Sequence, residues 1–333
     1  MNEKENKRLA ILGGGSWATA LAKLTLHNQR SLTWYIYEQS IVDEFRKTGR
    51  NPLYLSDVEF PMDRIRLTSD VNEAVRDADI ILLVVPSPYV DATLSGLTED
   101  ISHKTLISAV KGIVPQTNEI PSDYVRRRFH LDPARIGVVA GPCHAEEVAL
   151  GRKSFLTVAA PDIAFAEELA GLFAGPQLST ITATDVVGIE YAAVLKNVYA
   201  IAAGIVDGLQ GGDNFMAMLV SNAAQEMARF VEAVDPRPRD ICRSVYLGDL
   251  LVTCYSPLSR NRTLGAMLGR GMKVGDALQA MTQTAEGYYA SQCISRINNA
   301  VQAPMPIADA VNAILYRDAD PREAIRSAAE SFV

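Results

Sequence analysis

The stretch Arg8-Leu-Ala-Ile-Leu-Gly-Gly-Gly-Ser-Trp-Ala18 decides the fold of this chain. A short apolar run, a glycine turn and the start of a helical pattern follow one another here, as in the first unit of a dinucleotide-binding fold. We expect Gly13 to permit the tight turn, Gly15 to let a pyrophosphate approach the backbone, and Ala18 to keep helix and strand close. The N–H groups that would meet the anion belong to Ser16 and Trp17. The alternative is a glycine turn shaped only by packing.

The next strand ends at Tyr37-Glu38, where an acidic side chain lies 20 residues beyond Ala18. A carboxylate at this position accepts hydrogen bonds from the adenosine ribose hydroxyls. It would also repel a 2′-phosphate, so Glu38 favours NAD over NADP. The opposite preference would follow if Arg46 or Lys47 swung in to meet that phosphate.

The first half of the chain alternates β-rich runs with helical patterns, which predicts an α/β domain with a mainly parallel sheet. The predicted strands are Arg8–Leu12, Leu32–Tyr37, Ile80–Val85, Thr105–Val110, Ile136–Ala140, Phe155–Ala159 and Leu178–Ile181. The clearest predicted helices are Trp17–Asn28 and Ile163–Phe173. After about Val187 the β pattern ends and helical segments continue. We therefore expect a Rossmann-type dinucleotide-binding domain over 1–187 and an all-α substrate-binding, catalytic domain over 188–333.

Composition narrows the functional classes. The formal charge of −7 argues against nucleic acid as a partner and requires local cations for any anionic substrate. The charged N-terminal residues are unlike a secretory signal, and the apolar run Ile80–Val85 is too short to span a bilayer. We expect a soluble, cytoplasmic protein without stable membrane insertion. The four cysteines and four histidines show no disulfide or metal-ligand spacing, so we expect free thiols and no metal.

A lysine in apolar surroundings is the strongest candidate for chemistry. Lys196 lies in Glu190-Tyr-Ala-Ala-Val-Leu-Lys-Asn-Val-Tyr-Ala-Ile-Ala-Ala-Gly204, and its helical neighbours offer no acidic partner. Such a lysine tends to snorkel, to lose its proton or to serve a ligand, and desolvated ionisable groups mark functional sites. The alternative is a helix-end lysine that reaches water.

Three further segments carry polar groups that a plain core would not require. Lys111 follows a buried strand, where ligands of open α/β sheets bind, although surface lysines in loops are also common. In Ala140-Gly-Pro-Cys-His-Ala-Glu-Glu-Val148 a strand, a turn and a helix start follow one another, and Cys143 is interpreted as a small polar wall because no base for a nucleophile is evident. In Gly248–Arg262, Asp249 and Thr253 share a helix face, and an arginine fork suited to phosphate follows in a predicted loop at Arg260-Asn261.

Together these segments closely resemble bacterial NAD(P)-dependent sn-glycerol-3-phosphate dehydrogenases, over essentially the whole chain. The matching motifs are G-G-G-S-W-A-T-A-L-A at 13–22, N-P-L-Y-L at 51–55, V-K-G at 110–112, G-P-C-H-A-E-E-V at 141–148, L-K-N-V-Y-A-I-A-A-G at 195–204, G-D-N at 212–214, and G-D-L-L-V-T-C with S-R-N between 248 and 261. The resemblance implies reversible hydride transfer between NAD(P)H and C2 of dihydroxyacetone phosphate, giving sn-glycerol 3-phosphate for glycerophospholipid synthesis.

The resemblance also implies roles for individual residues. Lys196 would be the proton acceptor in glycerol 3-phosphate oxidation and the donor in the reverse direction, with Lys111 and Asp249 completing the catalytic site. The substrate-binding residues would be Lys111, Gly141, Cys143, Asn197, Thr253, Ser259, Arg260 and Asn261. The cofactor-binding residues would be Gly13, Gly15, Ser16, Trp17, Tyr37, Glu38, Lys111, Ala145, Arg260 and Glu286. The family, together with the apolar helical half, favours a homodimer.

Three positions depart from the family pattern. Cys143 stands where Ser or Thr is usual, and its thiol is a weaker hydrogen-bond donor than a hydroxyl group. Ser56 replaces a proline in a loop, and Tyr37 precedes Glu38 where many members have Arg or His for the NADP phosphate.

Two rival functions remain open. The first is an oxidoreductase of the 6-phosphogluconate or 3-hydroxyacid dehydrogenase type, which would turn over a carboxylated substrate. The second is a non-catalytic NAD(P)-binding sensor, which would have no need for a desolvated lysine.

Overall fold

The computed structural model describes residues 7–29 and 31–333, and the chain divides into two compact units. The first comprises the chain up to Val110 together with Pro121–Val186, and the second comprises Lys111–Ile120 and Val187–Val333. Residues 111–120, which the sequence analysis assigns to the first domain, thus group with the helical unit. The domain boundary at 187 stays a prediction, and the charged residues 1–6, on which the argument against a signal segment depends, lie outside the described residues.

The first unit contains an eight-stranded sheet with the order β3-β2-β1-β4-β5-β6-β7-β8. Adjacent strands are parallel except β6 and β7, which are antiparallel, so the predicted mainly parallel sheet is confirmed. The strand order reverses between β1 and β4, which makes the end of β1 the topological switch point where such sheets bind ligands. The strands are β1 (Leu9–Leu12), β2 (Leu32–Tyr35), β3 (Ile65–Thr68), β4 (Ile80–Leu83), β5 (Thr105–Ser108), β6 (Ile136–Ala140), β7 (Ser154–Ala159) and β8 (Leu178–Ala183).

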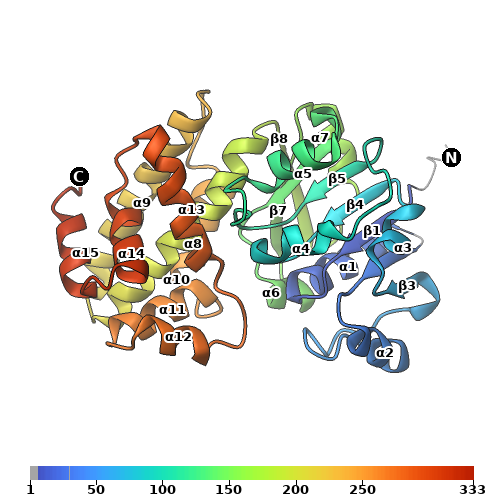
Figure 1. Ribbon diagram of the computed structural model, residues 1–333, viewed down its shortest axis with the longest axis horizontal. Coiled ribbons are helices and arrows are strands. Elements are labelled where there is room, and N and C mark those ends of the chain that lie inside the picture. Colours follow the sequence, from blue (N-terminus) through green and yellow to red (C-terminus); the bar gives the residue numbers. More distant parts are fainter. Residues whose placement is uncertain (1–6, 30) are drawn as a thin grey trace. The chain divides into compact units, whose positions relative to one another are not determined.

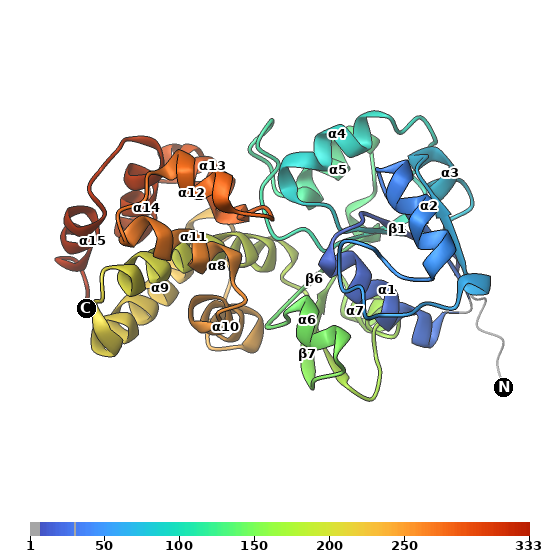
Figure 2. The same cartoon turned by 90° about the horizontal axis from the view of Figure 1, so that it is seen from below.

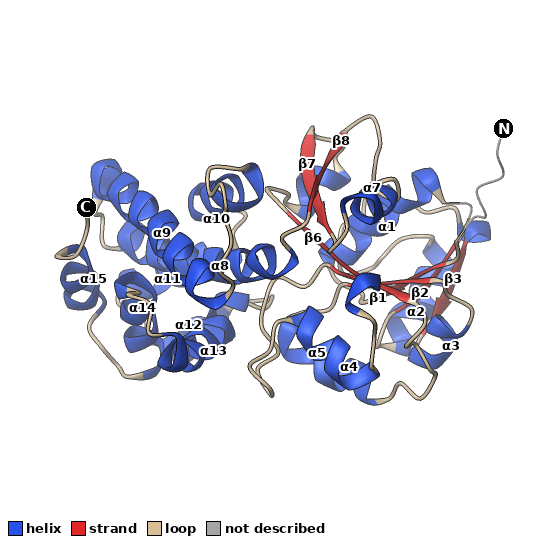
Figure 3. Cartoon of the chain, turned by 90° about the horizontal axis from the view of Figure 1, so that it is seen from above, coloured by secondary structure: helices blue, strands red, loops and turns tan. Residues whose placement is uncertain are grey.

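Helices cover both faces of this sheet. Figure 3 shows α1 and α7 on one face and α4 and α5 on the other. The helices of this unit are α1 (Ser16–Asn28), α2 (Gln39–Thr48), α3 (Val71–Arg76), α4 (Val90–Ser95), α5 (Pro121–Phe129), α6 (Ala145–Ala149) and α7 (Ile163–Ala170), with single 3-10 turns η1 (Met62–Arg64), η2 (Ser87–Tyr89) and η3 (Pro133–Arg135). All seven predicted strands are found, most of them shorter at an end, and the sequence analysis missed β3.

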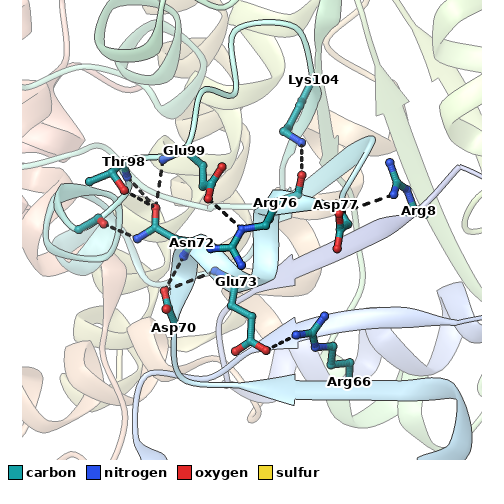
Figure 4. Close-up of polar contacts among 11 residues, drawn as sticks. Arg8, Arg66, Asp70, Asn72, Glu73, Arg76, Asp77, Thr98, Glu99 and Lys104 are labelled. Carbon is teal, nitrogen blue, oxygen red and sulfur yellow. Dashed lines mark hydrogen bonds and ion pairs between the residues drawn. The ribbon is translucent and has the colours of Figure 1, made fainter.

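Hydrogen bonds join both ends of α3 to the loop that precedes it and to the segment that contains Thr98, Glu99 and Lys104 (Figure 4). Asp70 caps the helix by accepting the N–H groups of Asn72 and Glu73, and Lys104 donates to the carbonyls of Arg76 and Ala78 at the other end. The Asn72 carboxamide oxygen accepts the N–H groups of Thr98 and Glu99. These bonds engage backbone groups at both ends of α3, where helices otherwise leave such groups without partners.

The second unit has no strand among its described elements, as the end of the β pattern near Val187 predicts, and helices α8 to α15 make up its bundle (Figures 1 and 2). Helix α8 is long and apolar enough to cross a bilayer, but the whole of its apolar window is buried, as expected of a core helix. The elements are α8 (Val186–Gly208), α9 (Gly212–Val234), a π-helical turn η4 (Ser244–Gly248), α10 (Asp249–Tyr255), α11 (Arg260–Gly269), α12 (Val274–Ala280), α13 (Glu286–Val301), α14 (Pro306–Tyr316) and α15 (Pro321–Ala329).

Glycines let α11 approach the backbone of α8. A Cβ built on Gly204 would lie 2.0 Å from the Arg262 carbonyl oxygen, and one on Gly265 would lie 2.0 Å from the Ile201 carbonyl oxygen. No larger residue fits at either position without separating the helices. The two helices that carry Lys196 and Arg260 are therefore held at backbone contact.

Candidate active site

The glycine turn after β1 has the conformation that the sequence predicts. Gly13 has φ +130°, and a Cβ there would lie 2.4 Å from the Val84 carbonyl oxygen, so only glycine fits. A Cβ on Gly15 would meet nothing within 4 Å, which leaves this side of the turn open to a ligand. Ala18 is fully buried in α1, which begins at Ser16. The turn therefore fits a pyrophosphate held by the N–H groups at the start of α1.

Two side chains that the sequence analysis did not single out hold this turn. The indole N–H of Trp34 donates to the Gly13 carbonyl at 2.7 Å, and the Asn51 carboxamide donates to the Gly14 carbonyl at 2.9 Å. The Gly13 N–H donates to the Tyr35 carbonyl at 3.0 Å, so the N–H groups offered to an anion are those further along, at the start of α1. Asn51 belongs to the N-P-L-Y-L motif on which the family resemblance partly depends, and its bond to the turn gives a physical reason for an asparagine at this position.

The predicted ribose site follows β2. Tyr37 is 75% exposed, and Glu38 is exposed and precedes the first turn of α2. Arg46 donates to the Leu67 carbonyl, and Lys47 pairs with Glu44. Neither basic side chain is bonded to Glu38, which is the first charged residue after β2.

The segment after β6 also has the predicted strand, turn and helix order. Gly141 has φ +137°, and a Cβ there would lie 2.9 Å from the Phe155 carbonyl oxygen. The Cys143 thiol donates to the same carbonyl at 3.2 Å. Ala145 begins α6, which packs against α1. Cys143 is thus a buried contact of the turn, and its interpretation as a small polar wall of a binding site stays a prediction.

The second unit brings two of the three predicted catalytic residues, Lys196 and Asp249, into direct contact. Lys196 is 4% exposed in the middle of α8, so the helix-end alternative is wrong. Its Nζ lies 2.5 Å from Oδ1 of Asp249, which is 1% exposed and begins α10 directly after the π-helical turn. Helical neighbours of Lys196 could not reveal this partner because it comes from 53 residues further along the chain.

A hydrogen-bonded hydroxyl, a buried thiol and one carboxylate oxygen without a partner complete the surroundings of this ion pair. Thr253 shares the α10 face with Asp249, as predicted, and its hydroxyl donates to the Asp249 carbonyl at 2.6 Å. Among the described side chains, Oδ2 of Asp249 is a buried acceptor without a hydrogen-bond partner. Burial raises the pKa of the Cys254 thiol to about 12, which argues against a thiolate nucleophile beside Lys196. The pair thus offers one proton donor and one open acceptor.

The segment Ser259–Asn261 is not the predicted loop. Ser259 caps α11 by accepting the Arg262 N–H, and Arg260 and Asn261 form the first helical turn. Arg260 is exposed, whereas Asn261 is buried. This helix start is hard to predict from the sequence because the serine cap follows directly after Ser256-Pro-Leu258, which is typical of a loop.

Asn197 links this turn to Lys111. Its carboxamide donates to the Lys111 carbonyl at 2.8 Å and accepts from Asn261 at 2.9 Å. The N–H of Gly287, next to Glu286 at the start of α13, donates to Asn261 at 2.8 Å. The predicted site residues of the second unit are Lys111, Lys196, Asn197, Asp249, Thr253, Ser259, Arg260, Asn261 and Glu286, and those of the first unit are Gly13, Gly15, Ser16, Trp17, Tyr37, Glu38, Gly141, Cys143 and Ala145.

Comparison with known proteins agrees with this architecture. Residues 8–166 match the family described as NAD-dependent glycerol-3-phosphate dehydrogenase N-terminus, and residues 185–326 match its C-terminus. A glycerol-3-phosphate dehydrogenase [NAD(P)+] of Exiguobacterium sp. is 35% identical over 96% of this chain and 94% of its own length. A second from Salinibacter ruber is 36% identical over 95% of this chain and 92% of its own length.

Solved structures extend the likeness. The crystal structure of glycerol-3-phosphate dehydrogenase from Coxiella burnetii matches with a TM-score of 0.90 and 30% identity, covering 98% of this chain and 99% of its own. A ketopantoate reductase from Ralstonia eutropha, at 16% identity and a TM-score of 0.61 over 96% of this chain and 99% of its own, shares only the fold. The chain belongs to the NAD-dependent glycerol-3-phosphate dehydrogenase family and is an NAD(P)-dependent oxidoreductase.

Proposed function

We propose that Lys196 exchanges a proton with the oxygen on C2 as dihydroxyacetone phosphate and sn-glycerol 3-phosphate interconvert. The observation that carries this proposal is the buried pair of Lys196 with Asp249. A lysine ammonium has three N–H donors, and Asp249 Oδ1 engages one of them, which leaves others for a substrate oxygen. When bound, the nicotinamide cofactor supplies the hydride.

The roles of the pair follow from its surroundings. Negative charge develops on the carbonyl oxygen during reduction, and Lys196 neutralises it by donating a proton, a role that typically contributes about 10²- to 10⁴-fold to the rate. Asp249 orients the ammonium through Oδ1, and its Oδ2 is suited to accept a hydrogen bond from a substrate hydroxyl. Burial strengthens both interactions because little water competes.

Arg260 and Asn261 are proposed to hold the substrate phosphate, assisted by Asn197 and Thr253. The position of Arg260 in the first turn of α11 adds a guanidinium fork to the positive end of a helix, and both favour a phosphate. A chain of net charge −7 requires such a local cation. We expect Arg260→Ala to raise the KM for dihydroxyacetone phosphate by about tenfold or more, and an unchanged KM would assign the phosphate to other residues.

The cofactor is proposed to be NAD in preference to NADP. Gly13, Gly15, Ser16 and Trp17 would hold the pyrophosphate, and Tyr37 and Glu38 the adenosine ribose. The family resemblance names Ala145, Lys111, Arg260 and Glu286 as further cofactor contacts. Gly141 and Cys143 would line the substrate site.

We further propose that the product enters glycerophospholipid synthesis and that the enzyme is a cytoplasmic homodimer without membrane insertion. Restored growth of a glycerol-requiring bacterial strain would support the metabolic role. Light scattering on the purified protein would measure the oligomeric state, and a monomer would overturn the dimer.

The deciding experiment is oxidation of NADH and NADPH with and without dihydroxyacetone phosphate, followed by absorbance of the reduced nicotinamide. Substrate-dependent turnover that falls at least about a hundredfold in Lys196→Ala is the expected result. Near-normal activity in that variant would remove Lys196 from the mechanism. Turnover of a carboxylated substrate instead would favour the hydroxyacid dehydrogenase alternative, and binding without turnover would favour a sensor.

A further inference from the structure

The loop 51–57, which follows α2, is bonded to the glycine turn through its first residue. Asn51 is fully buried, and its Nδ2 donates at 2.9 Å both to the Gly14 carbonyl and to Oγ1 of Thr19. The Thr19 hydroxyl donates in turn to the Gly15 carbonyl at 3.0 Å. One side chain of the loop therefore holds two carbonyls of the turn, one directly and one through Thr19.

The backbone of the loop fixes the direction of this amide. Oδ1 of Asn51 accepts the N–H groups of Leu53 at 3.1 Å and Tyr54 at 3.2 Å. Because an amide oxygen only accepts and an amide nitrogen only donates, these two bonds turn Nδ2 toward the Gly14 carbonyl. The hold on the glycine turn thus depends on where the loop places Leu53 and Tyr54.

Arg50 bridges the far side of the loop. Its guanidinium donates to the carbonyls of Ser56 at 3.3 Å and Asp57 at 3.2 Å, and it pairs with Glu59 at 2.8 Å. Ser56 is the position where the family pattern has a proline, so this chain lacks the ring that would restrict the backbone there. The bonds from Arg50 restrain the same stretch of main chain from outside.

One residue of the loop has a backbone conformation that requires such a restraint. Leu55 has φ +54°, in the left-handed region that favours glycine. Its carbonyl accepts the Val58 N–H at 2.8 Å, and the bonds from Arg50 act on the two residues in between. A residue in this region keeps its conformation only where the surrounding structure holds it. Without Arg50 the loop is expected to relax and to move the N–H groups that orient Asn51.

We propose that Arg50 is a positioning residue for the cofactor, acting through the loop and Asn51 on the glycine turn. It holds the loop in one conformation before the cofactor arrives. The Gly14 and Gly15 carbonyls then stay bonded to the protein, and the N–H groups at the start of α1 stay available to the pyrophosphate. A site that is formed only part of the time binds its ligand more weakly by that fraction. The inference rests on the proposed place of the pyrophosphate at this turn.

The test measures the Kd for NADH by calorimetry, without substrate, in Arg50→Ala, Asn51→Ala and the double variant. Arg50→Ala is expected to raise the Kd about threefold to tenfold, and Asn51→Ala about tenfold or more. Because Arg50 acts through Asn51, the double variant is expected to lie within about twofold of Asn51→Ala. An unchanged Kd in Arg50→Ala, or additive effects of the two changes, would overturn the inference.

Two control variants separate the carbonyl bonds from other effects. Glu59→Gln removes only an exposed ion pair, so the Kd is expected to stay within about twofold of wild type. Arg64 is the matched control, because its guanidinium also donates to two main-chain carbonyls, those of Leu26 and Gln29. Arg64→Ala is expected to lower the unfolding temperature with a Kd within about twofold of wild type. A rise in either control as large as that of Arg50→Ala would overturn the inference.

Hydrogen exchange distinguishes positioning from a merely structural role. In wild type the N–H groups of Leu53 and Tyr54 are expected to be protected with or without NADH. In Arg50→Ala they are expected to exchange at least about tenfold faster until NADH restores their protection. Fast exchange of both groups in wild type without NADH would show that the loop is not formed beforehand, and it would overturn the inference.

Steady-state kinetics keeps this inference apart from the proposed function. At saturating NADH, kcat and the KM for dihydroxyacetone phosphate of Arg50→Ala are expected within about twofold of wild type, because the cofactor has then ordered the loop. A kcat that stays low at saturating NADH would contradict a role in cofactor positioning. A wild type that binds NADH without turning over dihydroxyacetone phosphate would refute the proposed function, while the binding and exchange results would still test Arg50.

Discussion

Nζ of Lys196 lies 2.5 Å from Oδ1 of Asp249, and the two side chains are 5% and 2% exposed. Each charge therefore compensates the other where water cannot. Removing one partner leaves a buried charge uncompensated, which typically costs about 3–5 kcal/mol. We expect Lys196→Met and Asp249→Leu each to lose stability on this scale in urea unfolding.

The double variant Lys196→Met, Asp249→Leu gives the control. Replacing both charges by apolar side chains removes the uncompensated charge, so the free energy of unfolding is expected to recover most of the loss. Turnover is expected to stay at least about a hundredfold below wild type. A double variant as unstable as the sum of the singles would contradict the pairing.

The ion pair shows which features of the molecule could be predicted from local sequence and which could not. Local patterns predicted the glycine turn at Gly13, seven of the eight described strands and the burial of Lys196, because these depend on neighbouring residues. They could not predict that Asp249 pairs with Lys196, since the pairing depends on how α10 packs beside α8. The family resemblance placed Asp249 in the site without that geometry.

Two misses have equally physical causes. Strand β3, Ile65-Arg-Leu-Thr68, has an exposed arginine between two apolar residues, so it lacks the uninterrupted apolar run that marks the equally short strands β1 and β4. The second miss is the pair of hydrogen bonds from the Gly287 N–H to Asn261 and from Asn261 to Asn197, which join residues far apart in sequence. A polar side chain in a helical pattern does not indicate which distant groups it will bond.

Glu38 is expected to set the cofactor preference. Its charge at the end of β2 would repel a 2′-phosphate, so Glu38→Gln should raise the ratio of kcat/KM for NADPH to that for NADH by about fivefold to tenfold. Salt should reduce the effect, because Glu38 is exposed. Glu44→Gln, an exposed acid of α2 paired with Lys47, is the control and should leave the ratio unchanged. A wild type that prefers NADPH would contradict this role of Glu38.

Glu226 is expected to make stability depend on pH. This fully buried carboxylate of α9 accepts the N–H groups of Ile307 and Ala308 at the start of α14. Burial raises its pKa from 4.5 to about 7, against opposing contributions from these N–H groups, Tyr199 and Arg229. Between the two values the folded protein keeps a proton that the unfolded chain has lost, so stability should fall as the pH rises from about 5 to about 8.

The size of this fall follows from the pKa difference and is at most about 3 kcal/mol. Glu226→Gln cannot ionise and should flatten the dependence, although it gives up one N–H acceptor and should be less stable at low pH. Urea unfolding across this pH range measures both slopes. Equal slopes in the two proteins would show that Glu226 does not titrate in the folded state.

An alanine substitution is expected to have opposite effects at Gly204, in the contact between α8 and α11, and at Gly275, where there is open space. In Gly204→Ala the new methyl group would lie 2.0 Å from the Arg262 carbonyl oxygen, so the helices must separate, at a cost of about 1–3 kcal/mol. In Gly275→Ala, on α12, the methyl group meets nothing within 4 Å, and the change should stabilise the protein by up to about 1 kcal/mol. Because Arg260 begins α11, Gly204→Ala should also raise the KM for dihydroxyacetone phosphate, whereas Gly275→Ala should leave it unchanged. Thermal unfolding and steady-state kinetics measure both effects, and two variants of equal stability would mean that α8 and α11 are not in backbone contact.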